Sequence, residues 1–101
     1  VFAPGPILGG QVQILETPGH TEGHLSFYLP SAKALIAGDL VVLEEGALRL
    51  PYPQHSFDLE QARKSILAVA NLPISAVVCY HGGVLRADTG AIKRLLLCAA
   101  E

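Results

Sequence analysis

The sequence predicts an α/β (α+β) fold, in which a small mixed sheet carries helices on one side. Three observations support this fold class. Short runs with the period of strands fill the first part of the chain, a nearly uninterrupted apolar run lies at residues 74–80, and two segments with the period of amphipathic helices flank that run. With 101 residues the chain has the bulk of one small domain, so residues 1–101 are expected to form a single unit.

Four segments have the pattern of strands. In residues 11–17, Val12 and Ile14 alternate with glutamine, which is the period of a strand with one buried face. Residues 25–29 and 34–37 form a predicted hairpin, and residues 74–80 read as a strand covered on both faces because nearly all of them are apolar. The opening residues 1–10 hold two prolines and three glycines, so they are expected to be irregular.

Two segments have the pattern of helices. Asp58 can cap the first, whose apolar residues recur on one face until Pro73 ends the pattern. The second begins at about residue 89 and turns Lys93 and Arg94 outward. Residues 44–57, between the hairpin and the first helix, contain glycine and two prolines without a sustained period. Their length favours a functional or lid-like loop.

The composition excludes some classes of partner and suggests a hidden apolar face. Seven Lys+Arg stand against nine Asp+Glu, a formal charge of −2, which lacks the basic excess of a nucleic-acid binder. Half of the residues are apolar and only 16% are charged, against about a quarter in an average soluble domain. No apolar run reaches the roughly 20 residues of a membrane span, so we expect a soluble, cytoplasmic protein that binds no membrane.

Three polar residues follow apolar strands at their carboxyl ends: His20, Asp39 and His81. Glycine flanks each of them, so the backbone can turn sharply there or approach a ligand closely. Side chains at strand ends project into the mouth of a sheet from distant parts of the sequence, which is how α/β folds assemble their sites. Two imidazoles and one carboxylate suit zinc, iron or manganese. The sequence therefore predicts a candidate metal site at these three residues.

Other interpretations of the same residues stay open. A single histidine in a loop is more often a surface residue than a ligand, and Asp39 could instead form an Asx-turn or cap a helix. His24 and His55 are interpreted as structural or surface residues. Cys79 and His81 could form a cysteine nucleophile with its base, but the glycine at position 82 argues that the strand stops before the two side chains can share a face.

Three short sequence motifs together resemble those of a known protein family. In order along the chain they are Thr17-Pro18-Gly19-His20-Thr21-Glu22-Gly23-His24, Ala37-Gly38-Asp39 and Tyr80-His81-Gly82-Gly83. Together they closely resemble the metallo-β-lactamase fold superfamily, from about Val12 to the last helix. The resemblance implies that His20 corresponds to the third histidine of a first metal site, Asp39 to a carboxylate that bridges two metals, and His81 to the last histidine of a second site. It implies zinc as cofactor, with iron or manganese as alternatives.

One part of the family pattern is absent. The H-x-H-x-D-H word, which supplies four further ligands, does not occur, because no histidine precedes His20. The chain thus resembles only the C-terminal half of an αββα sandwich, and residues 1–101 are expected to be a single partial domain, a fragment of a hydrolase. In the parent, metal-bound hydroxide would attack an ester, thioester, lactone or lactam. This chain alone is expected to bind at most one ion weakly and to be inactive, and by resemblance residues 43–57 would face the substrate.

The absence of the second half also bears on partners. Its loss would expose the inner face of the sheet, and soluble monomers rarely tolerate a large apolar patch. We therefore expect self-association through that face, as a homodimer. The leading hypothesis is a partial metallo-hydrolase domain, the alternative is a non-catalytic self-associating half-domain, and the third is an ordinary α/β domain whose histidines are inert.

Overall fold

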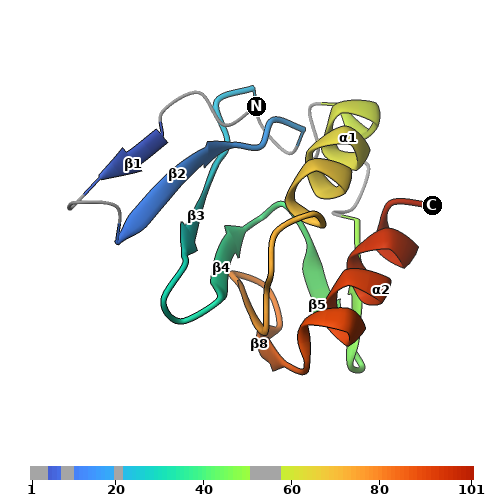
Figure 1. Cartoon of the computed structure of the whole chain (residues 1–101). Coiled ribbons are helices and arrows are strands. Elements are labelled where there is room, and N and C mark those ends of the chain that lie inside the picture. Colours follow the sequence, from blue (N-terminus) through green and yellow to red (C-terminus); the bar gives the residue numbers. More distant parts are fainter. Residues whose placement is uncertain (1–4, 8–10, 20–21, 51–57) are drawn as a thin grey trace.

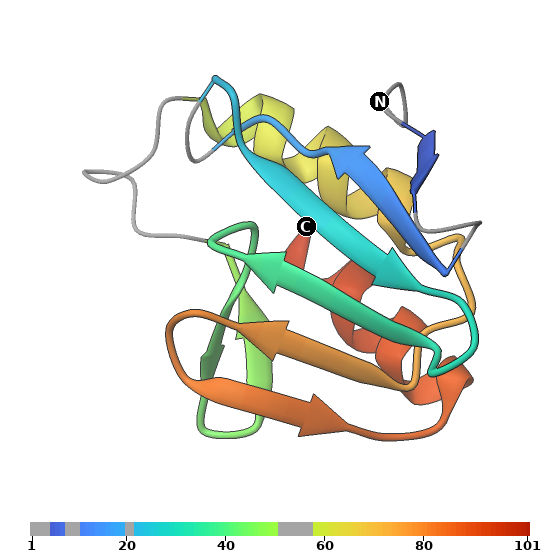
Figure 2. The same cartoon turned by 90° about the vertical axis from the view of Figure 1, so that its left-hand side faces the viewer.

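The computed structural model describes residues 5–7, 11–19, 22–50 and 58–101. It shows a mixed six-stranded sheet in the order β1-β2-β3-β4-β7-β8, with both helices on one face and a separate two-stranded sheet (Figures 1 and 2). The elements are β1 (Gly5–Ile7), β2 (Val12–Glu16), β3 (Leu25–Leu29), β4 (Ala34–Gly38), β5 (Val42–Glu44), β6 (Ala47–Arg49), α1 (Leu59–Val69), β7 (Ala76–Cys79), β8 (Gly83–Arg86) and α2 (Thr89–Ala99). The predicted fold class, a small mixed sheet with helices on one side, is confirmed.

Some short strands were not predicted. The expectation that residues 1–10 are irregular is wrong for β1, which pairs antiparallel with β2. Its proline, Pro6, is compatible with this pairing because β1 is the edge strand. The expected loop at residues 44–57 is wrong in its first part, where β5 and β6 form a hairpin, while residues 51–57 lie outside the described residues. Glu45 and Gly46 have φ of 51° and 78°, as a tight hairpin turn with two positive φ angles requires.

The last strand pair reverses at a glycine turn. The sequence suggested that the strand of residues 74–80 stops at Gly82, and β7 does end at Cys79. The chain then turns through Gly82 and Gly83, whose φ angles are 106° and 97°, and returns as β8 antiparallel to β7. These two glycines mark a reversal within the sheet.

The order of the strands decides where the candidate site lies. β2, β3 and β4 are antiparallel neighbours in sequence, so β2 and β4 run in the same direction. β7 lies beside β4 and parallel to it, and α1 lies in the connection between the two strands. The carboxyl ends of β2, β4 and β7 therefore meet at the same edge of the sheet.

The two helices cover one face of the sheet and form the core with it. Asp58 caps α1, because its carboxylate accepts hydrogen bonds from the backbone of Glu60 and Gln61, which confirms the predicted helix start. The buried side chains of the core come from both layers and include Leu15, Tyr28, Leu35 and Val77 of the sheet, Ile66 and Val69 of α1, and Ile92 and Leu96 of α2. Neither α1 nor α2 is long and apolar enough to cross a membrane.

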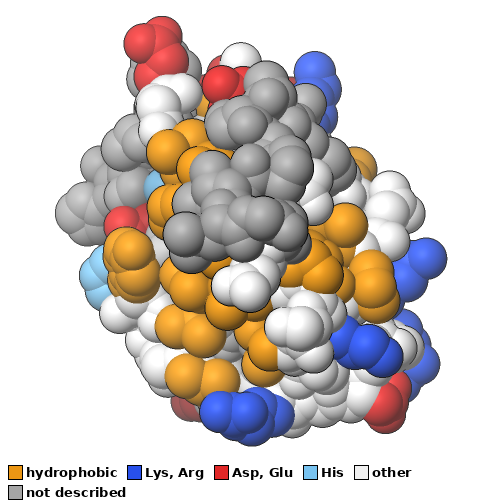
Figure 3. All heavy atoms as spheres, turned by 60° about the vertical axis from the view of Figure 1, so that its left-hand side comes forward, with side chains coloured by type: hydrophobic (Ala, Val, Ile, Leu, Met, Phe, Trp, Pro, Cys, Tyr) orange, Lys and Arg blue, Asp and Glu red, His pale blue; other side chains and the backbone are white. Residues whose placement is uncertain are grey.

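The opposite face of the sheet carries an apolar row that no described element covers. Cross-strand pairing aligns Ile14, Phe27, Ile36, Val78 and Val84 from β2 to β8. Figure 2 looks onto this face with both helices behind it, and Figure 3 shows hydrophobic side chains gathered there. Residues 74–80 were expected to be covered on both faces. In β7, Ala76 is buried on this open face, while Val78 is only partly buried. We call these five residues the apolar row.

Candidate metal centre

The structure brings two of the three predicted site residues together. Asp39 follows β4 and His81 follows β7, and the parallel pairing of these strands places both at the same edge of the sheet. Beyond the strands, the Tyr80 amide donates a hydrogen bond to the Gly38 carbonyl at 3.0 Å. The Nδ1 atom of His81 then lies 2.9 Å from the Oδ1 atom of Asp39. The side chain of His81 is 72% exposed and that of Asp39 24%, so the pair can be reached from solvent.

The third predicted residue, His20, lies outside the described residues. It belongs to the segment that leaves β2, whose carboxyl end shares an edge with those of β4 and β7. Thr17 precedes this residue and His24 follows it, and the backbone amide of Thr17 donates a hydrogen bond to the carbonyl of His24 at 3.0 Å. The role of His20, Asp39 and His81 as metal ligands stays a prediction.

His24 links this segment to the turn of Asp39. Its Nδ1 atom lies 2.9 Å from the Thr17 hydroxyl, and its Nε2 atom accepts a hydrogen bond from the Asp39 backbone amide at 3.0 Å. The Thr17 hydroxyl lies in turn 2.7 Å from the hydroxyl of Ser26, which donates to the Ala37 carbonyl at 3.3 Å. The sequence suggested that His24 is a structural or surface residue, and these hydrogen bonds support the structural role. Its reach to Asp39 was not predicted, although His24 stands in the same sequence word as His20.

The hairpin of β5 and β6 packs against the turn that carries His81. The amide of Leu43 donates a hydrogen bond to the His81 carbonyl at 3.0 Å. At the next residue, a side chain on Gly82 would overlap the carbonyl of Leu43, and its φ of 106° also favours glycine. The glycine therefore allows the hairpin to approach the candidate site without a gap.

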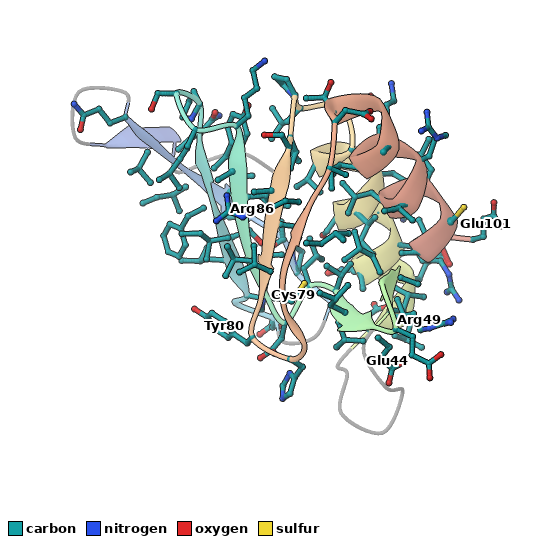
Figure 4. All side chains as sticks on the ribbon, turned by 90° about the horizontal axis from the view of Figure 1, so that it is seen from below. Glu44, Arg49, Cys79, Tyr80, Arg86 and Glu101 are labelled. Atoms are coloured by element: carbon teal, nitrogen blue, oxygen red, sulfur yellow. The ribbon has the colours of Figure 1, made fainter. Side chains whose placement is uncertain are left out.

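An open hollow on this hairpin is lined by charged residues. Glu44, Glu45 and Arg49 border it, and the Nε atom of Arg49 lies 3.5 Å from Oε1 of Glu44. Figure 4 shows Glu44 and Arg49 together on the hairpin, while Tyr80 points away from the helices. Both members of the ion pair are well exposed, so it contributes little to stability. The mixed charge of the hollow does not select one class of substrate.

Cys79 does not fit the alternative of a cysteine nucleophile. Burial raises the pKa of its thiol to about 11, and the residue is only 4% exposed. At neutral pH only about one molecule in 10⁴ would carry the reactive thiolate. Burial therefore keeps this side chain a thiol in the core.

The described residues fit a metal ion in chemistry but form only part of a site. Among them, no group of three or more histidine, cysteine, aspartate or glutamate side chains is arranged to hold an ion. Asp39 and His81 supply one carboxylate and one imidazole, a combination that suits zinc, iron and manganese. The Oδ1 atom of Asp39, which faces His81, is itself shielded from solvent, so the exposure of the pair comes from the rest of the two side chains. These two residues are thus compatible with the predicted centre, and His20 would add the third donor.

Comparison with known proteins defines the class of this chain. The sequence profile of the Metallo-beta-lactamase superfamily matches residues 4–81, which is most of the chain and includes all three predicted ligands. The chain belongs to this superfamily.

Two relatives and one solved structure show how far the similarity extends. A hydroxyacylglutathione hydrolase of Brucella anthropi is 55% identical over 72 residues, which make up 70% of this chain and 26% of that protein. The probable metallo-hydrolase YflN of Bacillus subtilis is 33% identical over an alignment of 79 residues, and the match covers 67% of this chain and 30% of the relative. The crystal structure of TTHA1623 in a di-iron-bound form superimposes with a TM-score of 0.64 at 28% identity, and the match covers 85% of this chain and 41% of that one. The chain thus spans less than half the length of each of these proteins.

Proposed function

We propose that this chain supplies part of the metal site of a metal-dependent hydrolase, with His20, Asp39 and His81 as ligands. The contact of 2.9 Å between Asp39 and His81, at the edge where β4 and β7 end side by side, is the observation that carries the proposal. The di-iron form of TTHA1623 supports a metal at this kind of site. The Brucella anthropi relative is named for hydrolysis of hydroxyacylglutathione, a thioester, which favours thioesters over esters, lactones and lactams as the substrate class.

The chain's own residues would divide the work of binding. A bound ion would lower the pKa of its water from the ordinary value toward about 7 and would polarise the carbonyl of the substrate. Asp39 supplies a negative oxygen that offsets part of the charge of a cation, and His81 supplies an imidazole nitrogen from the neighbouring strand end. The family's H-x-H-x-D-H word is absent from this sequence, so four further ligands are missing. We therefore expect at most one weakly bound ion and no substantial turnover from this chain alone.

Zinc titration of the chain tests this proposal. Asp39→Ala and His81→Ala each remove a ligand and are expected to weaken zinc binding by more than about 10-fold, since changes even outside the ligand set cost 10- to 100-fold. His20→Ala is expected to do the same. The affinity can be measured by competition with a chromophoric chelator.

The matched control is His55→Ala, which removes a histidine that the proposal does not use. This variant should leave zinc affinity unchanged. An unchanged affinity in both Asp39→Ala and His81→Ala would overturn the proposed site and favour the interpretation of inert residues. Thioester hydrolysis at the full rate of a complete family member, by pure chain loaded with zinc, would contradict the expected inactivity.

A second candidate function is self-association, and the apolar row favours it. Five apolar side chains aligned across the sheet, with Val84 48% exposed, form a continuous surface that water solvates poorly. A second copy could cover this surface by packing sheet on sheet, about 10 Å apart, in a two-fold dimer. In this alternative the chain would be a non-catalytic assembly module.

Sedimentation at tens of micromolar tests self-association. Val84→Lys places a charge at the apolar row and is expected to raise the dimer dissociation constant by more than about 10-fold. Leu67→Lys is the matched control, because Leu67 is 47% exposed on α1, on the helix side of the sheet. It should leave the dimer unchanged. A monomeric unsubstituted chain at these concentrations would contradict self-association.

A further inference from the structure

The imidazole of His24 uses both of its nitrogens to connect two segments of the candidate site. One nitrogen faces Thr17, at the end of β2, and the other faces the backbone amide of Asp39, after β4. We propose that His24 is a positioning residue, which fixes the turn of Asp39 so that its carboxylate is held ready for an ion. The consequence for ion binding rests on the function proposed above.

The direction of each hydrogen bond follows from the donors available. A backbone amide can only donate, so the Nε2 atom of His24 must accept from Asp39 and carry no proton. The neutral ring then has its proton on Nδ1, which donates to the Thr17 hydroxyl. Ser26 uses its single proton on the Ala37 carbonyl, so Thr17 must donate to Ser26. The chain of donors therefore runs from His24 through two hydroxyl groups to Ala37.

The hydrogen bonds at the two ends of this network are made with the same turn of the backbone. Ser26 holds the carbonyl of Ala37 and His24 holds the amide of Asp39, so the network grips the turn at the residues on either side of Gly38. Gly38 has a φ of 62°, and a Cβ there would lie only 3.1 Å from Nε2 of His24. The glycine thus leaves room for the ring as well as permitting the turn. The loop conformation and the histidine are matched to each other.

Because the hydroxyl groups of this network are buried, leaving any of them without a hydrogen-bond partner is costly. The side chains of Thr17 and Ser26 belong to residues that are 0% exposed, and a buried hydroxyl without a partner is costly. Each donor must therefore find its acceptor, which favours one arrangement of the network and one orientation of the imidazole. Because both ring nitrogens are used in this arrangement, His24 supports the site and does not itself act as a ligand in it.

Two substitutions separate the two functions of the ring. In His24→Asn the shorter side chain cannot reach the Asp39 amide but can donate an amide proton to Thr17, so this variant keeps only the Thr17 bond. His24→Gln extends an amide oxygen toward the position of Nε2 and keeps the acceptor for Asp39. We expect His24→Asn to lose at least about 10-fold of the exchange protection of the Asp39 amide and to weaken zinc binding by about 10-fold. His24→Gln should retain both within about 3-fold.

Amide hydrogen exchange by NMR reads the Asp39 amide in the chain without any ion, and chelator competition reads zinc binding. Equal losses in His24→Asn and His24→Gln, or unchanged exchange of the Asp39 amide in His24→Asn, would overturn the proposal. Failure of the unsubstituted chain to bind zinc would overturn the metal site, while the exchange comparison would still decide on His24. If His24→Asn does not fold, Thr17→Val and Thr17→Ser make the second pair. Only Thr17→Val should reduce Asp39 protection.

Discussion

Replacing Gly19 with alanine is expected to lower the free energy of unfolding by about 3 kcal/mol or more. Gly19 has a φ of 148°, in a region that residues with a side chain rarely adopt. A Cβ at this position would also overlap the backbone of Ala62 in α1, where no side chain can rotate away. The segment is held against the helix on both sides, because the Asp58 amide donates to the Gly19 carbonyl at 2.7 Å and Ser65 donates to the Pro18 carbonyl at 2.9 Å.

Gly23→Ala is the control, since Gly23 lies in the same loop with open space at its Cβ position. It should change the free energy of unfolding by less than about 1 kcal/mol. Urea denaturation measures both variants. Similar stability of the two would contradict the close packing of Gly19 on α1.

Gly19 also shows what a glycine beside a predicted ligand can mean. The sequence suggested that glycines next to His20, Asp39 and His81 permit a sharp turn or a close approach. The structure shows that Gly19 approaches a helix and Gly82 approaches the hairpin of β5 and β6. Both glycines therefore act on the site through packing, by letting a neighbouring element press against the loop that carries the ligand.

The longer elements could be predicted because their periodicity extends over enough residues. β2, β3, β4, α1 and α2 each span five or more residues, and Asp58 marks the start of α1 with a cap. The alternation in residues 11–17 predicted β2 but the wrong buried face, because Leu15 is buried under the helices while Ile14 lies in the apolar row. β5 and β6 have three residues each, too few for a period to be visible. Their hairpin depends on the turn at Glu45 and Gly46, whose positive φ angles a sequence pattern only hints at.

The candidate site could be predicted in its residues but not in its arrangement. Asp39 and His81 meet because β7 pairs with β4 and not with another strand, and this pairing joins residues about forty positions apart. The histidine at position 24 was visible in the same word as His20, yet its bond to the Asp39 amide spans 15 residues. Such contacts are set by the tertiary fold, which local pattern does not determine.

Leu35 and Ile36 are neighbours on β4 that face opposite sides of the sheet. Substituting each of them with alanine therefore compares how tightly the two faces are packed. Leu35 is fully buried beneath the helices, and Leu35→Ala is expected to lower the free energy of unfolding by about 3 kcal/mol through the cavity it leaves. Ile36 belongs to the apolar row and is only half-buried. In dilute solution Ile36→Ala should therefore cost about 1 kcal/mol.

The dependence of these two free-energy losses on protein concentration shows whether a second copy covers the apolar row. If a second copy packs on the row, the cost of Ile36→Ala should rise with protein concentration, because the lost contacts then belong to a dimer. The cost of Leu35→Ala should stay constant, since its contacts lie within one chain. Chemical denaturation at about 1 and about 100 µM measures both. Equal costs for the two substitutions at the lower concentration would contradict the open face, because Ile36 would then lose as many contacts within a single chain as Leu35 does.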